Sequence, residues 1–287
     1  MSGARLLAVC GLAVGVALST LTDTTPSREL ITVAGYQVLS GDFHVHAFVG
    51  DGGIPPWMLQ RHAARLGLDV IAITNHNQTL AARLGRSSAQ RSGPLVLVGE
   101  EITGRDFHLI GIGIERTVNW DQPVRAAIAD VHAQGGVAIA AHPTRGFDGY
   151  DPAALADLDG VEVAHRDALS SVMSLQFEKF YQRALVQNPE VAAIGSSDFH
   201  TSGPMGLCRT HLLVRERSEA GVIDAIRDGR TVGRCEGSPL RGRPELVHLL
   251  EPYRDALAPP DETLAQTLAL LLAWVSLVAL AIVGLRG

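Results

Sequence analysis

The sequence predicts an α/β fold in which the central part of the chain forms a barrel of parallel strands. Three observations support this. Short apolar runs alternate with helical patterns, metal-ligating side chains recur where those runs end, and both terminal segments are strongly apolar. Alternating strands and helices favour a parallel sheet, and 287 residues with 46% hydrophobic content suffice for one large domain of this kind.

The candidate strands are short apolar runs, as expected where a parallel sheet is covered on both faces. They cover residues 38–46, 70–74, 95–98, 107–114, 137–141, 160–164 and 191–197, with an extra strand expected over residues 211–215. The candidate helices cover residues 55–66, 78–86, 122–134, 151–157, 170–187 and 218–228. About seven such strands in one domain favour closure into a barrel over 36–236, whose active site would lie at the carboxyl ends of the strands.

The two ends of the chain predict targeting segments. An apolar run after Arg5 indicates a signal peptide or an N-terminal anchor over residues 1–22, and the sequence leaves both open. Residues 264–285 carry three polar side chains and are long enough for a transmembrane helix, at about 1.5 Å per residue. Residues 237–262, rich in proline, are expected to be a loose tether between the barrel and this helix.

The charges beside these segments predict where the barrel lies. Arg5 and Arg286 would both lie inside under the positive-inside rule, which places the barrel outside the cytoplasm, in the periplasm or at the cell surface, attached through its C-terminal helix. In an oxidising compartment Cys208 and Cys235 are able to pair, although their spacing alone does not show that they do.

Composition argues against long nucleic acids as partners. The formal net charge is −6, Lys179 is the only lysine, and no stretch mixes basic with aromatic residues. No CxxC pair is present, which argues against a zinc finger or a redox motif. No feature indicates a protein partner.

Histidine and carboxylate side chains mark the ends of the predicted strands. In a strand, alternate side chains share a face, so His44 and His46 point together and are able to grip one ion. The nine residues expected to converge are His44, His46, Asp51, His76, Glu101, His108, His142, Asp198 and His200. Imidazole with carboxylate suits zinc, manganese or iron, and three or four ligands suffice per catalytic ion, so nine ligands predict two or three divalent ions.

These motifs resemble one family. Asp42-x-His44-x-His46, Gly50-Asp51-Gly52, the segment 73–77, Glu101-Ile102-Thr103, Ala141-His142-Pro143 and the segment 195–200 are similar to the motifs of the PHP (polymerase and histidinol phosphatase) family. The resemblance spans residues 38–233. It implies a distorted (β/α)7 TIM-like barrel with a site of two or three metal ions that hydrolyses phosphoesters.

The resemblance also implies how the ligands are shared. His44, His46, Glu101 and Asp198 would hold the first ion. Glu101 would bridge to a second ion completed by His108 and His142, and Asp51, His76 and His200 would hold a third. Glu100 is an alternative to Glu101 as the bridge.

Other residues near these motifs depart from the family's pattern or have roles that the motifs do not assign. Asn75 stands where members of the family commonly have Asp, which predicts weaker support for His76. Glu162 is either a support for the ligands or a buried strand partner, and the role of His165 is open. Arg145 is a candidate clamp for phosphate.

The expected function is a membrane-tethered, metal-dependent phosphoesterase that acts on a small phosphomonoester or nucleotide through a metal-bridging hydroxide. Glu101 and Asp198 would surround that hydroxide. The alternatives are a nuclease or nucleoside bisphosphate phosphatase acting on nucleic-acid ends, a non-catalytic metal-binding sensor module and, less favoured, a single-metal amidohydrolase. Amidohydrolases that bridge two metals with a strand lysine are excluded, because Lys179 falls inside a predicted helix.

Overall fold

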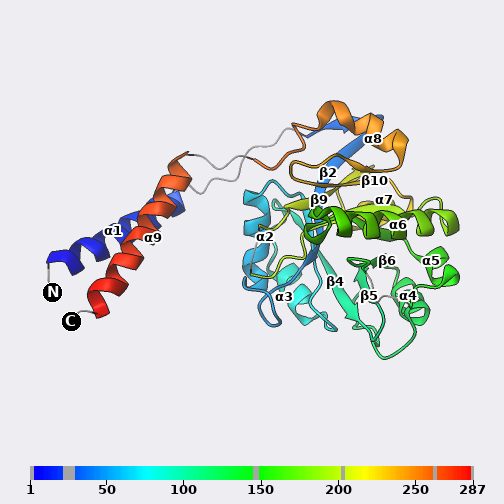
Figure 1. Cartoon of the computed structure of the whole chain (residues 1–287), viewed down its shortest axis with the longest axis horizontal. Helices are drawn as coiled ribbons and strands as arrows, with labels where there is room; N and C mark the ends of the chain where they lie inside the picture. Colours follow the sequence, from blue (N-terminus) through cyan, green and yellow to red (C-terminus); the bar gives the residue numbers. More distant parts are fainter. Residues whose placement is uncertain (1–2, 22–29, 145–148, 202–203, 261–263, 286–287) are drawn as a thin grey trace. The chain divides into compact units, whose positions relative to one another are not determined.

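A computed structural model describes the chain except for residues 1–2, 22–29, 145–148, 202–203, 261–263 and 286–287. The chain divides into two compact units, residues 28–259 and the pair of terminal segments 1–27 and 260–287 (Figure 1).

The larger unit is built on one mixed sheet whose order is β11-β10-β9-β2-β3-β4-β5-β6-β7-β8, with β1 paired to β2 outside this path. The strands are β1 Thr32–Val33, β2 Tyr36–Val45, β3 Val70–Ile73, β4 Leu95–Thr103, β5 His108–Ile112, β6 Val137–Ala140, β7 Gly160–His165, β8 Ala192–Ser196, β9 Cys208–Val214, β10 Thr231–Cys235 and β11 Arg241–Gly242. Seven of them, β2 to β8, follow one another in sequence and in space.

The sheet curls until its first and last barrel strands meet. Just beyond β8, Phe199 forms a parallel bridge with Val45 of β2. The amide of His46 donates to the Phe199 carbonyl at 2.8 Å, and the amide of Phe199 donates to the His44 carbonyl at 3.2 Å. The result is a near-closed barrel, as the sequence predicts.

The barrel departs from the expected parallel arrangement at β5, which runs antiparallel to both β4 and β6. The reason is the connection: residues 104–107 join β4 to β5 with no room for a crossover helix. Strands β9 and β10 are antiparallel as well and extend the sheet beside β2.

Helices surround the outside of the sheet (Figure 1). They are α2 Pro56–Arg65, α3 Leu80–Ser88, α4 Val124–Ala133, α5 Pro152–Asp157, α6 Ser171–Gln187, α7 Glu219–Arg227 and α8 Pro244–Leu250, with 3-10 turns η1 Arg166–Leu169 and η2 Glu251–Tyr253. Hydroxyl or carboxylate side chains start several of them: Asp151 accepts from Ala154 N, and Ser218 accepts from Gly221 N. Such caps satisfy amides that have no partner inside the helix.

The core has an inner and an outer part. Leu39, Phe43, Leu97, Ile110 and Ile194 belong to one fully buried cluster formed from several barrel strands. Other buried clusters join the sheet to its helices. Burying a side chain of this size stabilises the fold by about 1.5–3 kcal/mol, which holds the strand ends in fixed positions.

Residues 237–262 are not a loose tether over most of their length. They contain β11, α8 and η2, and Leu240, Leu250 and Leu257 are buried in a cluster with Val38 and Val232 of the barrel. The larger unit therefore extends to Pro259. The proline-rich composition reflects short helices that begin with proline, at Pro244 and near Pro252.

The smaller unit is a pair of helices, α1 Gly3–Leu21 and α9 Leu264–Leu285. They pack closely where glycines face α9, since a Cβ on Gly15 would lie 2.6 Å from the Ala273 nitrogen. Among the described residues, no helix is both long enough and apolar enough to cross a bilayer. The predicted transmembrane span over 264–285 is therefore not supported, and the signal or anchor at 1–22 is left without support.

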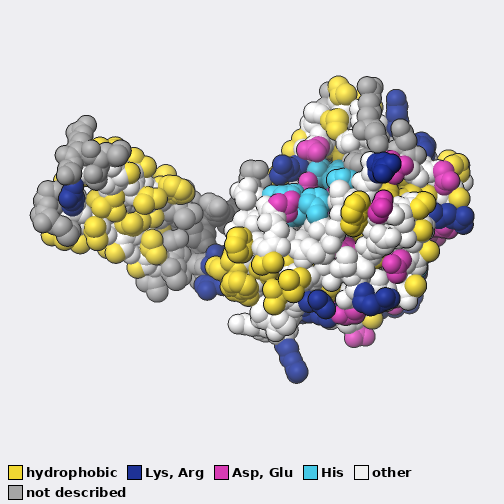
Figure 2. Space-filling view, turned by 90° about the horizontal axis from the view of Figure 1, so that it is seen from below, with side chains coloured by type: hydrophobic (Ala, Val, Ile, Leu, Met, Phe, Trp, Pro, Cys, Tyr) yellow, Lys and Arg dark blue, Asp and Glu magenta, His cyan; other side chains and the backbone are white. Residues whose placement is uncertain are grey.

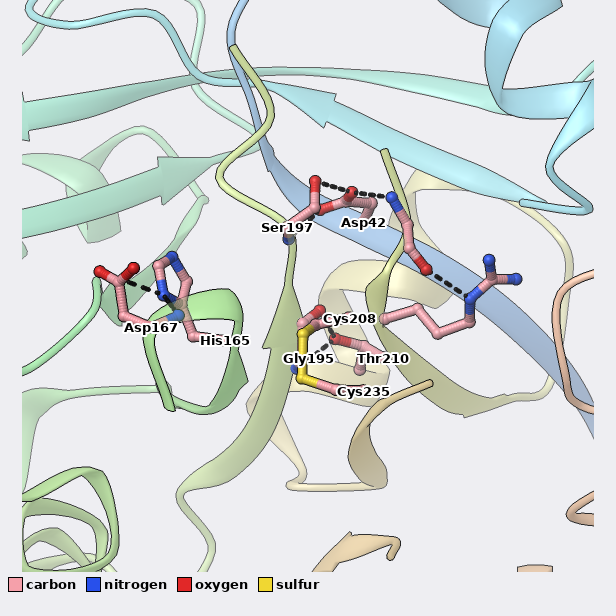
Figure 3. Close-up of a disulfide and its surroundings, with 10 residues drawn as sticks. Asp42, His165, Asp167, Gly195, Ser197, Cys208, Thr210 and Cys235 are labelled. Carbon is pink, nitrogen blue, oxygen red and sulfur yellow. Dashed lines mark hydrogen bonds and ion pairs between the residues drawn. A yellow bond between two sulfur atoms is a disulfide. The ribbon is translucent and has the colours of Figure 1, made fainter. Parts of the chain in front are cut away.

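A disulfide joins β9 to β10 through Cys208 and Cys235 (Figure 3). The two residues are direct partners in the antiparallel ladder. The sequence left this pairing open, and the structure contains it.

Removing this disulfide should destabilise the larger unit. Without the cross-link the unfolded chain gains conformational entropy. For residues 27 apart, this should lower the free energy of unfolding by about 3–4 kcal/mol. Denaturant unfolding of a Cys208→Ser/Cys235→Ser variant measures this. Cys10→Ser is the control, since Cys10 is free; equal stability of the double variant and the wild type would contradict the prediction.

Candidate metal centre

The site begins at the end of β2, where His44 and His46 point to the same side and are both fully buried. The Nε2 atom of His44 lies 3.2 Å from Glu101 Oε2 and 3.2 Å from Asp198 Oδ1. The Nε2 atom of His46 lies 3.3 Å from each of the same two oxygens. Four potential ligand atoms from three different strand ends therefore surround one point.

These four atoms have an unusual property for buried polar groups. Within the described part of the chain, His44 Nε2, His46 Nε2, Glu101 Oε2 and Asp198 Oδ1 have no hydrogen-bond partner. Buried polar atoms without partners are rare, because a polar atom that loses its hydrogen bonds to water and gains none in the protein raises the free energy of the folded state. A cation at their centre would satisfy all four at once.

The spacing of these atoms also fits a small divalent ion. An ion held tetrahedrally with ligand distances of about 2.0 Å keeps its ligands about 3.3 Å apart. The four distances of 3.2–3.3 Å match this value. The residues present thus fit the metal that the sequence predicts.

Glu101 faces two clusters at once. Its Oε2 atom belongs to the first group, whereas its Oε1 atom lies 2.6 Å from His108 Nδ1 and 3.0 Å from His142 Nε2. One carboxylate with an oxygen in each group is the arrangement of a bridging ligand. Glu101, His108 and His142 form a second candidate site.

A third group lies nearer the surface. Asp51 Oδ2 is 3.3 Å from His76 Nε2 and 3.1 Å from His200 Nε2, while Asp51 Oδ1 is 3.1 Å from His46 Nδ1. The side chain of Asp51 is 45% exposed and that of His76 is 38% exposed. This side of the site therefore opens to solvent.

The structure brings all nine predicted residues together in these three groups. Figure 2 shows histidine side chains gathered on one face of the larger unit with acidic side chains beside them. Arg145, the candidate phosphate clamp, lies outside the described residues. That the nine side chains bind metal stays a prediction.

The charges of the site depend on one another. Burial by itself would raise the pKa of Glu101, but His44, His108 and His142 hold this pKa well below its usual range. Burial would likewise lower the pKa of His44, but Asp198, Glu101 and Glu162 raise it well above its usual value. Without metal, protons on the imidazoles thus supply the positive charge that the carboxylates require.

Glu162 supports two of the predicted ligands. Its fully buried carboxylate lies 3.0 Å from His44 Nδ1 and accepts from the His142 amide at 2.5 Å. A carboxylate on Nδ1 fixes the proton there and leaves Nε2 free to bind an ion. Of the two roles that the sequence left open, the structure favours support of the ligands.

Asp42 ties the end of β2 to the segment after β8. Its carboxylate accepts from Ser197 N at 3.0 Å, from Ser197 Oγ at 2.5 Å and from Gly206 N at 2.8 Å (Figure 3). Burial raises the pKa of Asp42 to about 6, against these hydrogen bonds. Asp198 is thereby held beside His44 and His46.

Glu100 and Glu101 have different surroundings because adjacent strand residues point to opposite faces. Glu100 accepts from Val118 N at 2.5 Å, away from the histidines, and burial raises its pKa to about 7. The preference for Glu101 as the bridge agrees with this geometry.

Weaker support for His76 stays a prediction, but the structure shows what the side chain of Asn75 contacts. Its amide makes two hydrogen bonds to Ala47, accepting from the Ala47 amide at 3.0 Å and donating to the Ala47 carbonyl at 2.8 Å. A carboxylate is unable to donate the second bond. His76 is instead contacted by Thr103, whose Oγ1 lies 2.6 Å from His76 Nδ1.

Two ligand positions have unusual backbone conformations. His142 has φ 25° and Asp198 has φ 49°, both in the left-handed region that non-glycine residues rarely adopt. Such conformations cost free energy and occur where surrounding contacts enforce them, often at functional sites. The hydrogen bond that the His142 backbone amide donates to Glu162 is one such contact.

His165 also borders the site, although the sequence gave it no definite role. It is fully buried at the end of β7, and its Nε2 atom lies 3.8 Å from Asp198 Oδ2. Its position just after a strand was the signal available in the sequence, the same signal that marked the nine predicted residues.

Sequence comparisons connect this chain to known proteins. A family model described as PHP-associated matches residues 183–231. The chain is 28% identical over 159 residues to an uncharacterized protein of Methanocaldococcus jannaschii, a match that covers 48% of this chain and 90% of that protein. It is 32% identical over 80 residues to a phosphoribosyl 1,2-cyclic phosphate 1,2-diphosphodiesterase of Eggerthella lenta, covering 26% of this chain and 30% of the relative.

Structural comparisons agree on the fold. A two-domain protein from Bacteroides vulgatus that contains a predicted PHP-like metal-dependent phosphoesterase superposes with a TM-score of 0.62 at 24% identity, covering 81% of this chain and 74% of that one. PsfC from Pseudomonas syringae superposes with a TM-score of 0.53 at 17% identity, covering 77% and 99%. At these identities the likeness establishes the barrel-like α/β fold.

Metal binding should release protons and weaken in acid. In the metal-free protein the pKa values of His44, His46 and His142 are raised, and these imidazoles must lose their protons to ligate. The apparent affinity for Zn²⁺ should therefore fall as the pH is lowered from about 8 to about 6. Calorimetric titrations in two buffers of different ionisation enthalpy measure the protons released; identical heats in both would contradict the prediction.

Proposed function

We propose that this chain is a metal-dependent phosphoesterase of the PHP family and that it hydrolyses a small phosphomonoester or nucleotide at a centre of two or three divalent ions. The observation that carries this proposal is the convergence of four buried ligand atoms that lack a hydrogen-bond partner among the described residues. One of them belongs to Glu101, whose carboxylate also faces a second group of histidines. Zinc, manganese and iron all suit this donor set.

The residues divide the work of the reaction. The ions, when bound, would lower the pKa of a coordinated water and neutralise charge on the phosphoryl oxygens. His44, His46, Glu101 and Asp198 would hold the first ion in a pocket where the histidines are fully buried, so bulk water is kept away and electrostatic effects are strong. Glu162 fixes the orientation of His44.

The direction of approach supports a small substrate. Exposure increases from His44 and His46, which are fully buried, to Asp51 and His76, which are more than a third exposed. A phosphoryl group would therefore enter from the Asp51 side. The formal net charge of −6 and the single lysine argue against a long polyanion at this opening.

The alternatives are separable by assay. A panel should contain an aryl phosphate, a nucleoside bisphosphate, an oligonucleotide and a cyclic phosphodiester, the last because the Eggerthella relative is named as a cyclic phosphate diphosphodiesterase. Turnover of the oligonucleotide would favour a nuclease. Metal binding without turnover of any member would favour a sensor module.

Glu101→Gln should abolish activity without unfolding the protein. The substitution keeps the shape but removes the negative charge between the two groups of histidines, and loss of a bridging ligand should lower kcat/KM by at least about 100-fold. Glu100→Gln is the matched control: its side chain is the neighbouring carboxyl, is also buried, and faces Val118.

The comparison requires circular dichroism, metal content and turnover of all three proteins. We expect both variants to fold, and the Glu100→Gln variant to keep wild-type turnover. Full activity in the Glu101→Gln variant would refute the bridging role.

We also propose that the larger unit works outside the cytoplasm. The Cys208–Cys235 disulfide supports this, since disulfides persist in oxidising compartments. A reporter that is active in one compartment only, fused after Pro259, tests it, and a cytoplasmic signal would end the proposal. Fractionation of the chain with and without residues 260–287 tests whether the terminal unit holds the protein at a membrane.

A further inference from the structure

We propose that His165 binds an oxygen of the substrate phosphoryl group as a neutral Nε2–H donor, and that it is not a metal ligand. The inference rests on the proposed function and names a residue that would contact the substrate at the same site. It follows from the position of the ring, from the hydrogen bond that fixes its tautomer, and from the missing partner of its second nitrogen.

The position of His165 is beside the candidate metal centre, on the side of β7. The ring centroid lies 5.5 Å from that of His142 and 6.4 Å from that of His44. The ring also stacks on Phe177 of α6, with centroids 5.7 Å apart and planes 19° apart. Phe177 is fully buried, so the imidazole plane has little freedom to rotate.

The tautomer of His165 is set by the turn that follows β7. The backbone amide of Asp167, in η1, donates to His165 Nδ1 at 3.2 Å (Figure 3). An Nδ1 atom that accepts a hydrogen bond carries no proton, so in the neutral ring the proton is on Nε2. The Asp167 carboxylate, at 3.7 Å from Nδ1, is too far for a hydrogen bond that would reverse this assignment.

His44 has the opposite arrangement. A carboxylate oxygen of Glu162 lies 3.0 Å from its Nδ1, which places a proton on Nδ1, so that in the neutral ring Nε2 carries the lone pair. Although His44, Glu162 and His165 are close enough to form a candidate metal group, the Nε2 of His165 presents a proton and not a lone pair. In this tautomer Nε2 has no lone pair for an ion and is able to donate to an acceptor.

The Nε2–H of His165 lacks an acceptor among the described residues. The atom is buried, and the nearest carboxylate oxygen, Asp198 Oδ2, is 3.8 Å away. A buried donor without a partner is costly, and each such group in a native structure calls for an explanation. A phosphoryl oxygen beside Asp198 would supply the acceptor, because phosphate oxygens accept and do not donate when ionised.

The first test reads the tautomer directly and needs no turnover. Long-range ¹H–¹⁵N correlation spectra of the metal-free protein distinguish a protonated from an unprotonated ring nitrogen. We expect His165 to be protonated on Nε2 and bare on Nδ1. The reverse assignment would overturn the inference.

The second test measures phosphate binding. In the metal-loaded protein, the affinity for inorganic phosphate should fall about 10- to 100-fold in His165→Leu, the loss expected for one hydrogen bond to a charged group. His165→Gln should recover part of it, because its amide is able to donate. His132→Gln is the control, since His132 lies on α4 and pairs with Asp159 far from the site.

Three outcomes separate the possibilities. Loss of bound metal in His165→Leu would identify His165 as a ligand, or as a support for Asp198, and would overturn the inference. Unchanged phosphate affinity with unchanged kcat/KM would overturn it as well. If the wild type turns over no phosphoester, the proposed function fails, whereas a His165-dependent fall in phosphate affinity would still uphold the donor role.

Discussion

The arrangement of the strand ends depends on one electrostatic requirement, which is that a carboxylate buried inside the barrel must be neutralised. Glu101 is buried, and a buried carboxylate is stable only when positive charge and hydrogen-bond donors surround it. Histidines from the ends of β2, β5 and β6 lie around it, so the strands that carry them are held at one rim. In the metal-free chain protons on the histidines provide the charge; divalent ions would replace those protons and would be held by the ring nitrogens that they leave.

Around this centre, hydrogen bonds from buried polar residues hold the predicted ligands in position. Glu162 orients His44 and holds the strained backbone at His142. Asn75 uses both ends of its amide to hold Ala47 after the His-x-His segment. These hydrogen bonds position the predicted ligands in advance, which is the condition under which charges in a protein stabilise a transition state effectively.

Much of this was accessible from the sequence because two periodicities govern it. Side chains along a strand alternate between its two faces, which predicted that His44 and His46 share a face and that Glu100 and Glu101 do not. The alternation of strands with helices predicted that the strand ends lie at one rim. The antiparallel direction of β5 was missed because an apolar run carries no sign of direction; only the short connection at 104–107 shows it. The packing of 237–262 was missed because prolines at helix starts resemble prolines in a linker. The role of Asn75 and the tautomer of His165 depend on backbone groups that side-chain patterns do not report.

Because of the contacts of Asp42, the candidate metal centre is complete only once residues far along the chain have been synthesised. Its partners Ser197 and Gly206 lie 155 and 164 residues further along the chain. A nascent chain emerging from the ribosome therefore carries its first histidines long before the groups that position them have been synthesised. A chain that ends before Ser197 and Gly206 therefore lacks the hydrogen bonds that join the first barrel strand to the segment after the last.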